Sequence, residues 1–436
     1  MAKKMGFWPV LSIVFGSQIG SGIFVLPASL APYGFWGILG WCLAGLGAIM
    51  LAMVFAELCT RFPEIGGPHK YVQMVFGRMF SFYIGWAYWL VSWVSSTVLV
   101  ILSVSYLSPI TGIFSPAMTF MLEVGLLAVV CAINCKSVEL SGRVEFVLTL
   151  MKFVPFVVVP ALIIGNFDAS NIMLAPEYES TSILELITKV TVLCFWGFIG
   201  VECATTPAGN VKNPGKTIPN AIIVGTCGVA LVYIVNSVTI MGVIPGTELA
   251  VSNAPFVDAI KVVVGKNMSI LLSIIASIVC IGTLNAWTLT SAQISLGLAQ
   301  DGLLPEIFAR KNSSGSPYAG VIISSIGMLP IILLTKSDNF SAQINYIVDF
   351  SVKAFLVIYM ACCIAFLGEV IRDRKIGKAI VGIVAMAFCA LMVVESTPQS
   401  LLVAATFFVS GIFMLPFIKR GHGETGGDKS TKVLSK

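Results

Sequence analysis

The segment Gly16-Ser17-Gln18-Ile19-Gly20-Ser21-Gly22-Ile23-Phe24 lies within the first long apolar stretch of the chain, residues 8–31. From residue 16 to residue 22 it holds three glycines and two serines, which are poor material for a continuous helix. A second interruption, Trp196-Gly197-Phe198-Ile199-Gly200-Val201-Glu202, lies in the apolar stretch 184–206 and ends on a carboxylate. Both patterns predict helices that are broken partway along their length.

The whole chain is too apolar for a water-soluble protein. Its 436 residues are 57% hydrophobic and 11% charged, with a mean hydropathy of +0.95, whereas ordinary soluble domains carry about 25% charged residues. This composition excludes a soluble enzyme, a nucleic-acid-binding protein and a disordered chain, and it predicts an all-α integral membrane protein in a lipid bilayer. The 11 scattered cysteines match no zinc or redox spacing, so we expect no metal or cofactor.

Apolar stretches long enough to cross a bilayer occur about twelve times. No interval between them could hold a separate soluble domain, so residues 1–418 are predicted to form one transmembrane domain. Residues 419–436 are polar and rich in glycine, which predicts a disordered cytoplasmic tail. The predicted spans are residues 8–31, 36–58, 80–108, 118–135, 144–165, 184–206, 218–244, 268–299, 318–335, 341–368, 377–394 and 398–418.

The distribution of lysine and arginine predicts the orientation of these spans. With the N-terminus in the cytoplasm, the inner segments hold 20 of the 26 basic residues and the outer segments hold three. Cytoplasmic loops carry the excess of positive charge. We therefore expect both termini to be cytoplasmic.

The two interruptions lie five spans apart, which indicates a duplicated architecture. Two units at about 8–165 and 184–368, followed by extra helices at about 377–418, account for all the predicted spans. Interrupted helices at matching positions are typical of inverted-repeat transporters with a site at the membrane midplane. The freed amides suit an anion and the freed carbonyls suit a cation, as in an amino acid. The alternative is a patch of small residues that only lets helices pack closely.

Several segments between about residues 5 and 418 carry a resemblance to a known group of proteins. They are Gly20-Ser21-Gly22-Ile23-Phe24-Val25-Leu26-Pro27, Gly66-Gly67-Pro68, Tyr88-Trp89-Leu90, residues 196–202, Val211-Lys212-Asn213-Pro214, Asp301-Gly302-Leu303-Leu304-Pro305 and Pro317-Tyr318-Ala319-Gly320. The chain resembles the amino acid–polyamine–organocation (APC) superfamily, and within it the basic amino acid/polyamine antiporters, particularly the arginine/agmatine exchangers. The resemblance implies a LeuT-type 5+5 inverted repeat with broken first and sixth helices, located in the cell inner membrane.

The resemblance also implies roles for residues at the two breaks. Ser21 and Gly22 match the residues that bind the substrate carboxylate. The carbonyls of Gln18, Trp196 and Ile199 match those that bind the substrate ammonium. Both ends of an amino acid would thus be bound by the unwound backbone.

Further residues match the side chains around the substrate. Trp287 matches the tryptophan that stacks on a cationic head group, an attraction of about 2 kcal/mol or more in a dry site. Trp196 resembles a gate over the bound substrate. Tyr88, Glu202 and Tyr359 resemble the opposite gate, where two phenols hydrogen-bond one carboxylate.

Four serines define the expected pocket and its departures from the arginine exchangers. Ser17 and Ser96 stand where those exchangers carry asparagines, while Ser92 lies near the head-group pocket and Ser351 is retained. Serine is shorter than asparagine and offers fewer hydrogen bonds. The identity of the substrate therefore stays open, although Trp287 still indicates an amine.

Three lysines fall inside predicted spans, where a charge costs at least about 2.5–3.5 kcal/mol and usually has a function. Lys189 lies near the outer end of its span, where its ammonium is expected to reach the membrane surface. Lys152 resembles the lysine that, in sodium-independent members of the superfamily, replaces a bound cation. It is the candidate coupling residue, either as a titrating group or as a fixed strut. Lys353 follows Ser351 by two residues, which predicts that it points away from the substrate.

Two functions follow from this reading. The first is a secondary active antiporter that exchanges a basic amino acid, such as arginine, for its amine, such as agmatine, or for another amino acid. The second is a proton-coupled, sodium-independent uptake permease, with neutral amino acids among its candidate substrates. Neither is an enzyme, since no HExxH or GxSxG motif occurs. The sequence leaves open whether the chain forms a homodimer.

Overall fold

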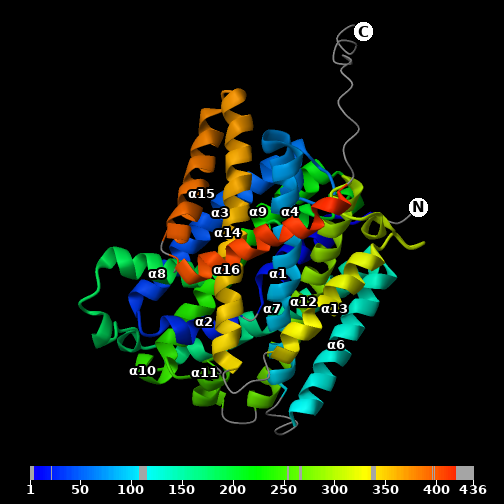
Figure 1. The fold of residues 1–436 in the computed structure, drawn as a ribbon. Helices are drawn as coiled ribbons and strands as arrows, with labels where there is room; N and C mark the ends of the chain where they lie inside the picture. Colours follow the sequence, from blue (N-terminus) through cyan, green and yellow to red (C-terminus); the bar gives the residue numbers. More distant parts are fainter. Residues whose placement is uncertain are drawn as a thin grey trace, which may run out of the picture.

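The computed structural model shows a chain that is almost entirely helical where it is described (Figure 1). Ser21 and the tail at 419–436 lie outside the described residues. The structure describes residues 4–20, 22–107, 115–252, 255–264, 268–334, 340–394, 396 and 398–418.

Long apolar helices follow one another along the chain and are joined by short connections. The α-helices are α1 Phe7–Gln18, α2 Gly22–Leu30, α3 Phe35–Arg61, α4 Pro68–Ser105, α6 Pro116–Lys136, α7 Val138–Ile163, α8 Ile183–Phe195, α9 Pro214–Val243, α10 Gly246–Leu249, α11 Pro255–Val264, α12 Met268–Gln300, α13 Tyr318–Leu334, α14 Phe340–Arg372, α15 Ile376–Val394 and α16 Pro398–Val409. The 3-10 helices are η1 Ile164–Asn166, η2 Ala169–Asn171, η3 Pro176–Tyr178, η4 Trp196–Phe198, η5 Cys203–Thr205, η6 Ala208–Asn210, η7 Glu306–Ala309 and η8 Ser410–Phe417.

The helices are long and apolar enough for a multi-pass membrane protein. Among the described residues, 10 helices satisfy the length and hydropathy expected of a span, or up to 11 if the bent pair α1 and α2 counts as one. The further apolar helix α13 has 17 residues. The prediction of an all-α membrane protein is therefore confirmed.

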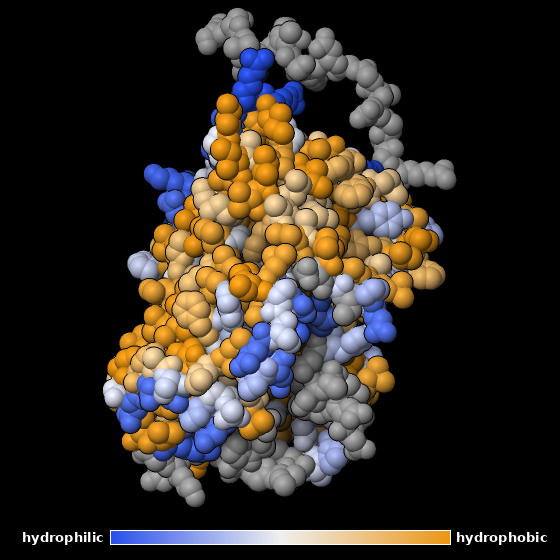
Figure 2. Space-filling model, turned by 90° about the vertical axis from the view of Figure 1, so that its left-hand side faces the viewer, coloured by the Kyte–Doolittle hydropathy of each residue, from blue (hydrophilic) through white to orange (hydrophobic). Residues whose placement is uncertain are grey.

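The surface of the protein also indicates that it lies in a membrane. Large apolar side chains are exposed on the outer helices, among them Val157 on α7, Leu231 on α9 and Ile380 on α15. Figure 2 shows hydrophobic side chains covering a broad area of one face, with hydrophilic ones gathered near the top and in the lower part. Such a surface is stable against lipid and unfavourable in water.

Two helices are interrupted where the glycine-rich segments lie. α1 ends at Gln18 and α2 begins at Gly22, with a bend of 41° between them. α8 ends at Phe195, and the chain continues through η4 to Gly200, whose φ of +106° is in the region that favours glycine. A Cβ at Gly200 would lie 2.9 Å from the Cβ of Ser17, so the two breaks pack against each other.

The broken helix α1 lies inside the bundle, packed against α7, α9 and α12. Nine of its twelve residues are buried, including the polar Ser12, Ser17 and Gln18. Polar side chains at such depth need partners. Gln18 Nε2 donates to Thr226 Oγ1 on α9 at 3.3 Å, and the Ser17 hydroxyl lies 3.0 Å from Gly200 O in the second break. Ser12 donates to a carbonyl within α1. The polar side chains of α1 therefore connect it to α9 and to the second break.

A polar cluster joins the start of α4 to the end of α12. His69 Nε2 lies 3.0 Å from Asp301 Oδ2, and Lys70 forms an ion pair with the other oxygen of the same carboxylate. Burial alone would raise the pKa of the Asp301 carboxyl, but the hydrogen bonds to His69 and Lys70 outweigh burial and hold that pKa below its usual value. We refer to these three residues as the Asp301 cluster.

Candidate functional site

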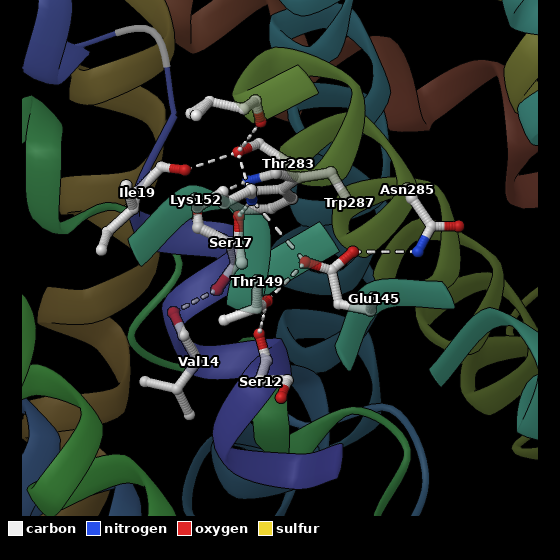
Figure 3. Close-up of polar contacts among 12 residues, drawn as sticks. Ser12, Val14, Ser17, Ile19, Glu145, Thr149, Lys152, Thr283, Asn285 and Trp287 are labelled. Atoms are coloured by element: carbon white, nitrogen blue, oxygen red, sulfur yellow. Dashed lines mark hydrogen bonds and ion pairs between the residues drawn. The ribbon is translucent and has the colours of Figure 1, made fainter. Parts of the chain in front are cut away.

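The last carbonyls of α1 lack helical partners, and side chains from three other helices satisfy them (Figure 3). Each of the four carbonyls accepts one side-chain hydrogen bond: Gly16 O from Lys152 Nζ at 3.1 Å, Ser17 O from Trp287 Nε1 at 3.1 Å, Gln18 O from Tyr233 Oη at 3.0 Å and Ile19 O from Thr283 Oγ1 at 2.7 Å. The donors belong to α7, α12 and α9.

These contacts modify the expectation that the unwound carbonyls are bare. A carbonyl oxygen has two lone pairs, so each of these groups can accept a second hydrogen bond. An ammonium group at this point would share the carbonyls with the protein's own donors.

A small closed cavity of about 30 Å³ lies between the two breaks. Of the residues predicted to bind substrate, Ser17, Gln18, Gly22, Ser96, Trp196, Ile199 and Trp287 line it. Further residues complete the lining: Gly20, Ser95, Leu99, Gly197, Tyr233 and Thr283. Since one water molecule occupies about 30 Å³ in the liquid, an amino acid enters only if the lining side chains move.

Two of the predicted residues that the structure describes are not part of this lining. Ser92 and Ser351 are fully buried elsewhere on α4 and α14, where the Ser92 hydroxyl donates to Trp89 O at 2.7 Å. Ser21 lies outside the described residues. Tyr233 and Thr283 were not predicted, because a single tyrosine or threonine in an apolar helix is usually a packing residue.

Trp196 separates the small cavity from a larger one. Both Trp196 and Gly22 line the two cavities. A Cβ at Gly22 would lie 3.0 Å from Cδ1 of Trp196, so the indole packs against bare backbone at the start of α2. The indole therefore lies at the boundary between the two cavities.

On the other side of Gly200, a buried carboxylate and two phenols lie together. Tyr359 donates a hydrogen bond to Glu202 and accepts one from Gly200 N at 3.2 Å. Tyr88 is completely buried and near enough to Glu202 to interact with it. Both phenols thus lie beside the same carboxylate, and the hydrogen bond from Tyr359 is the shorter contact.

Trp287 is 5% exposed and its ring lines the small cavity. Its indole N–H is already used by Ser17 O, and its ring packs at 5.3 Å on Phe355. These two contacts hold the ring in one orientation. An immobilised indole in a dry cavity can attract a cation by its π face.

Lys152 has a buried acidic partner that the sequence reading missed. Its ammonium donates to Gly16 O and, at 3.0 Å, to Thr283 Oγ1, while Glu145 Oε1 lies 3.7 Å away (Figure 3). The two side chains are 1% and 0% exposed. Glu145 precedes Lys152 by seven residues, two helical turns along the same face of α7, a spacing that could have revealed the pair.

The Glu145 carboxylate is bonded on both oxygens. It accepts from Asn285 Nδ2 at 2.9 Å and from Thr149 Oγ1 at 3.3 Å. A Cβ at Gly16 would lie 1.9 Å from Glu145 Oε1, so only glycine fits there. The pair therefore connects α7, α12 and the break in α1. Among the described residues, no group of three or more His, Cys, Asp or Glu side chains could hold a metal ion.

Two broken helices that meet beside one buried cavity, inside an apolar helical protein, define a membrane transport protein with a central site. The sequence profile of the amino acid permease family matches residues 5–418, and the chain belongs to this family.

Characterised relatives match almost the full length of the chain. The cadaverine/lysine antiporter of Escherichia coli is 28% identical over 97% of this chain and 96% of its own length. A putative arginine/ornithine antiporter of Bacillus subtilis is 27% identical over 95% of this chain and 97% of its own length. A putrescine transporter of Haemophilus influenzae is 27% identical over 82% of this chain and 83% of its own length.

Proposed function

We propose that this protein is a secondary active antiporter that exchanges a basic amino acid for its decarboxylated amine, or for another amino acid. The observation that carries the proposal is the single cavity lined by both helix breaks and by the Trp287 ring. The unwound backbone suits the common α-amino acid group, and the indole suits a cationic head. The relatives, which handle lysine and cadaverine, arginine and ornithine, or putrescine, support the same substrate class.

The finer architecture is part of this proposal. If the bent pair α1 and α2 is counted as one span and α13 as another, the chain has twelve spans. We arrange them as inverted repeats at about 8–165 and 184–368, followed by extra helices at about 377–418. The breaks in the first and sixth spans support this LeuT-type arrangement. The excess of basic residues in alternate connections supports an inner-membrane location with both termini in the cytoplasm.

The substrate's two charged ends are assigned to different sides of the cavity. Ser21 and Gly22, at the start of α2, bind the carboxylate, and the carbonyls of Gln18, Trp196 and Ile199 bind the α-ammonium. Trp287 stacks on the head group. The hydroxyls of Ser17 and Ser96, which line the cavity, complete the polar environment, whereas Ser92 and Ser351 lie outside the lining.

Gating is assigned to the aromatic groups above and below the cavity. Trp196 closes the side toward the larger cavity. Tyr88, Glu202 and Tyr359 close the other side. The small volume between these two groups supports their assignment as gates.

Lys152 supplies a fixed positive charge where a coupling cation would otherwise sit, which supports transport without sodium. The second candidate function, proton-coupled uptake, is favoured by the same residue, because a buried lysine can also release a proton. The ion pair with Glu145 favours exchange, since it stabilises the charged form of the lysine.

Purified protein in liposomes tests the choice between these functions. Labelled lysine is offered outside vesicles that contain lysine, cadaverine or no substrate. An exchanger takes up label rapidly only into loaded vesicles. Equally fast uptake into empty vesicles under an inward proton gradient would instead establish the proton-coupled permease.

A further inference from the structure

The larger cavity lies directly beyond Trp196 and has a volume of about 340 Å³, enough for a basic amino acid or a diamine. It is bounded by α2, α4, the end of α8 and the lower part of α14 in Figure 1. Its walls are mostly apolar, with valines and leucines from all four elements. Since Trp196 and Gly22 belong to both cavities, this space is the approach to the small cavity from that side.

Two charged side chains line this approach, and among the described residues at the cavity they are the only ones. Asp349 and Lys353 stand one turn apart on α14 and form an ion pair. Lys353 is 5% exposed and Asp349 is 45% exposed. Lys353 does not line the small cavity, in keeping with the expectation that it points away from the substrate, but it lies in the wall of the approach.

A charge in an apolar wall acts strongly on any charged molecule that passes it. The surrounding side chains are poorly polarisable, so charges there are screened less than in bulk water. The ammonium of Lys353 repels a basic substrate and the carboxylate of Asp349 attracts it. Together they leave the wall with no net charge.

We propose that the Asp349–Lys353 pair is a specificity-determining element that sets how strongly the approach discriminates between substrates of different net charge. The proposal rests on the proposed function, in which an amino acid of charge +1 is exchanged for a diamine of charge +2. A neutral wall lets both substrates approach on similar terms. An unbalanced wall would bind one of the two substrates more tightly than the other from this side.

The reason for a pair, instead of two apolar residues, lies in this balance. Asp349 alone would attract the diamine more strongly than it attracts the amino acid. Lys353 alone would repel the diamine more strongly than it repels the amino acid. Each effect grows with the charge of the substrate. Removal of either partner should therefore change the ratio of the two affinities, in opposite directions.

The experiment measures dissociation constants of labelled cadaverine and labelled lysine on one preparation of each variant in detergent. Lys353→Met should raise the affinity for cadaverine about fourfold more than the affinity for lysine. Cadaverine carries one more positive charge than lysine, and repulsion between that charge and an ammonium about 10 Å away corresponds to roughly this factor at an effective dielectric constant of about 40. Asp349→Asn should shift the ratio the other way. The double variant Asp349→Asn, Lys353→Met should restore the wild-type ratio.

Lys189→Met is the matched control. This exposed lysine lies on α8, three residues before Val192 of the cavity wall, and packs over the ring of Tyr178. It should leave the ratio unchanged.

Three outcomes overturn the proposal: equal changes for both compounds, a ratio that moves equally in Lys189→Met, or a double variant that keeps the shift of one single variant. Because Asp349→Asn leaves a buried lysine unpaired and can unfold the protein, Lys353→Met and the double variant decide the matter without it. A wild-type protein that binds neither compound would overturn the proposed function itself, and the proposal with it.

Discussion

Replacement of Glu145 by glutamine removes the negative charge beside Lys152 and keeps the shape of the side chain. The ammonium of Lys152 would then be 1% exposed with no counter-charge at 3.7 Å. It would keep its hydrogen bonds to Gly16 O and Thr283 Oγ1. We expect a large loss of stability with little change in packing.

The magnitude follows from the geometry. Two unit charges 3.7 Å apart interact by about 4.5 kcal/mol at an effective dielectric constant of about 20. Measured costs of breaking a buried ion pair are about 3–5 kcal/mol, because the remaining charge stays buried. The double variant Glu145→Gln, Lys152→Met removes both charges and should recover most of that loss.

Equilibrium unfolding of the purified protein in mixed detergent micelles measures these free energies. Glu139→Gln is the matched control, since Glu139 lies on the same helix and pairs with the exposed Arg143, an interaction worth at most about 1 kcal/mol. A Glu145→Gln variant no less stable than this control would refute the reasoning. So would a double variant whose loss equals the sum of the two single losses.

Three further predictions concern the site and the fold. Trp287→Leu should weaken binding of a basic substrate about 10–30-fold, because it removes a cation–π contact. The control Trp89→Leu removes another tryptophan that is 5% exposed and should change the same dissociation constant less than about twofold. Gly200→Ala should lower the free energy of unfolding by about 1–3 kcal/mol because of its positive φ, whereas Gly125→Ala, with open space around its Cβ, should be neutral or slightly stabilising. The Asp301 carboxyl has a lowered pKa, so its contribution to stability should be complete above its usual pKa of 3.8 and should be lost as the pH falls below that value. Between pH 7 and pH 3, the unfolding midpoint of Asp301→Asn should therefore fall less steeply than that of the wild type. Parallel pH profiles of the two proteins would contradict the assignment.

Much of the fold could be predicted from hydropathy alone, because lipid requires long, continuous apolar helices. The predicted spans 36–58, 118–135 and 377–394 agree closely with α3, α6 and α15. The start of α4 was the largest difference. Helix begins at Pro68, twelve residues before the predicted start, but Gly77, with a non-helical φ of +77°, separates this first stretch from the long apolar part of α4. Hydropathy finds only the part after this kink.

The short helices α10 and α11 were not predicted at all. They lie between α9 and α12, in a stretch too short and too polar to read as a span. α11 has ten residues with one apolar side, a pattern too brief to distinguish from a loop.

The site was predictable where the chain itself unwinds. Glycine patterns indicated both breaks, so the predictions that Ser17 and Ile199 lie near the centre agree with the described cavity. Tyr233 and Thr283 donate to the broken helix from distant helices, and single residues in apolar runs carry no such signal. The spacing between Glu145 and Lys152 places both on the same face of α7, so the sequence does indicate this pair.

The bonds to the four carbonyls at 16–19 have a kinetic consequence. Their donors belong to three separate helices, so any tilt of α1 relative to these helices breaks several bonds in one movement. At about 1 kcal/mol for each bond, a cargo whose ammonium replaces the donor to Gln18 O would let the carrier change sides about fivefold faster than the empty one. Part of the coupling between inward and outward flux would then originate in the backbone of a single helix end.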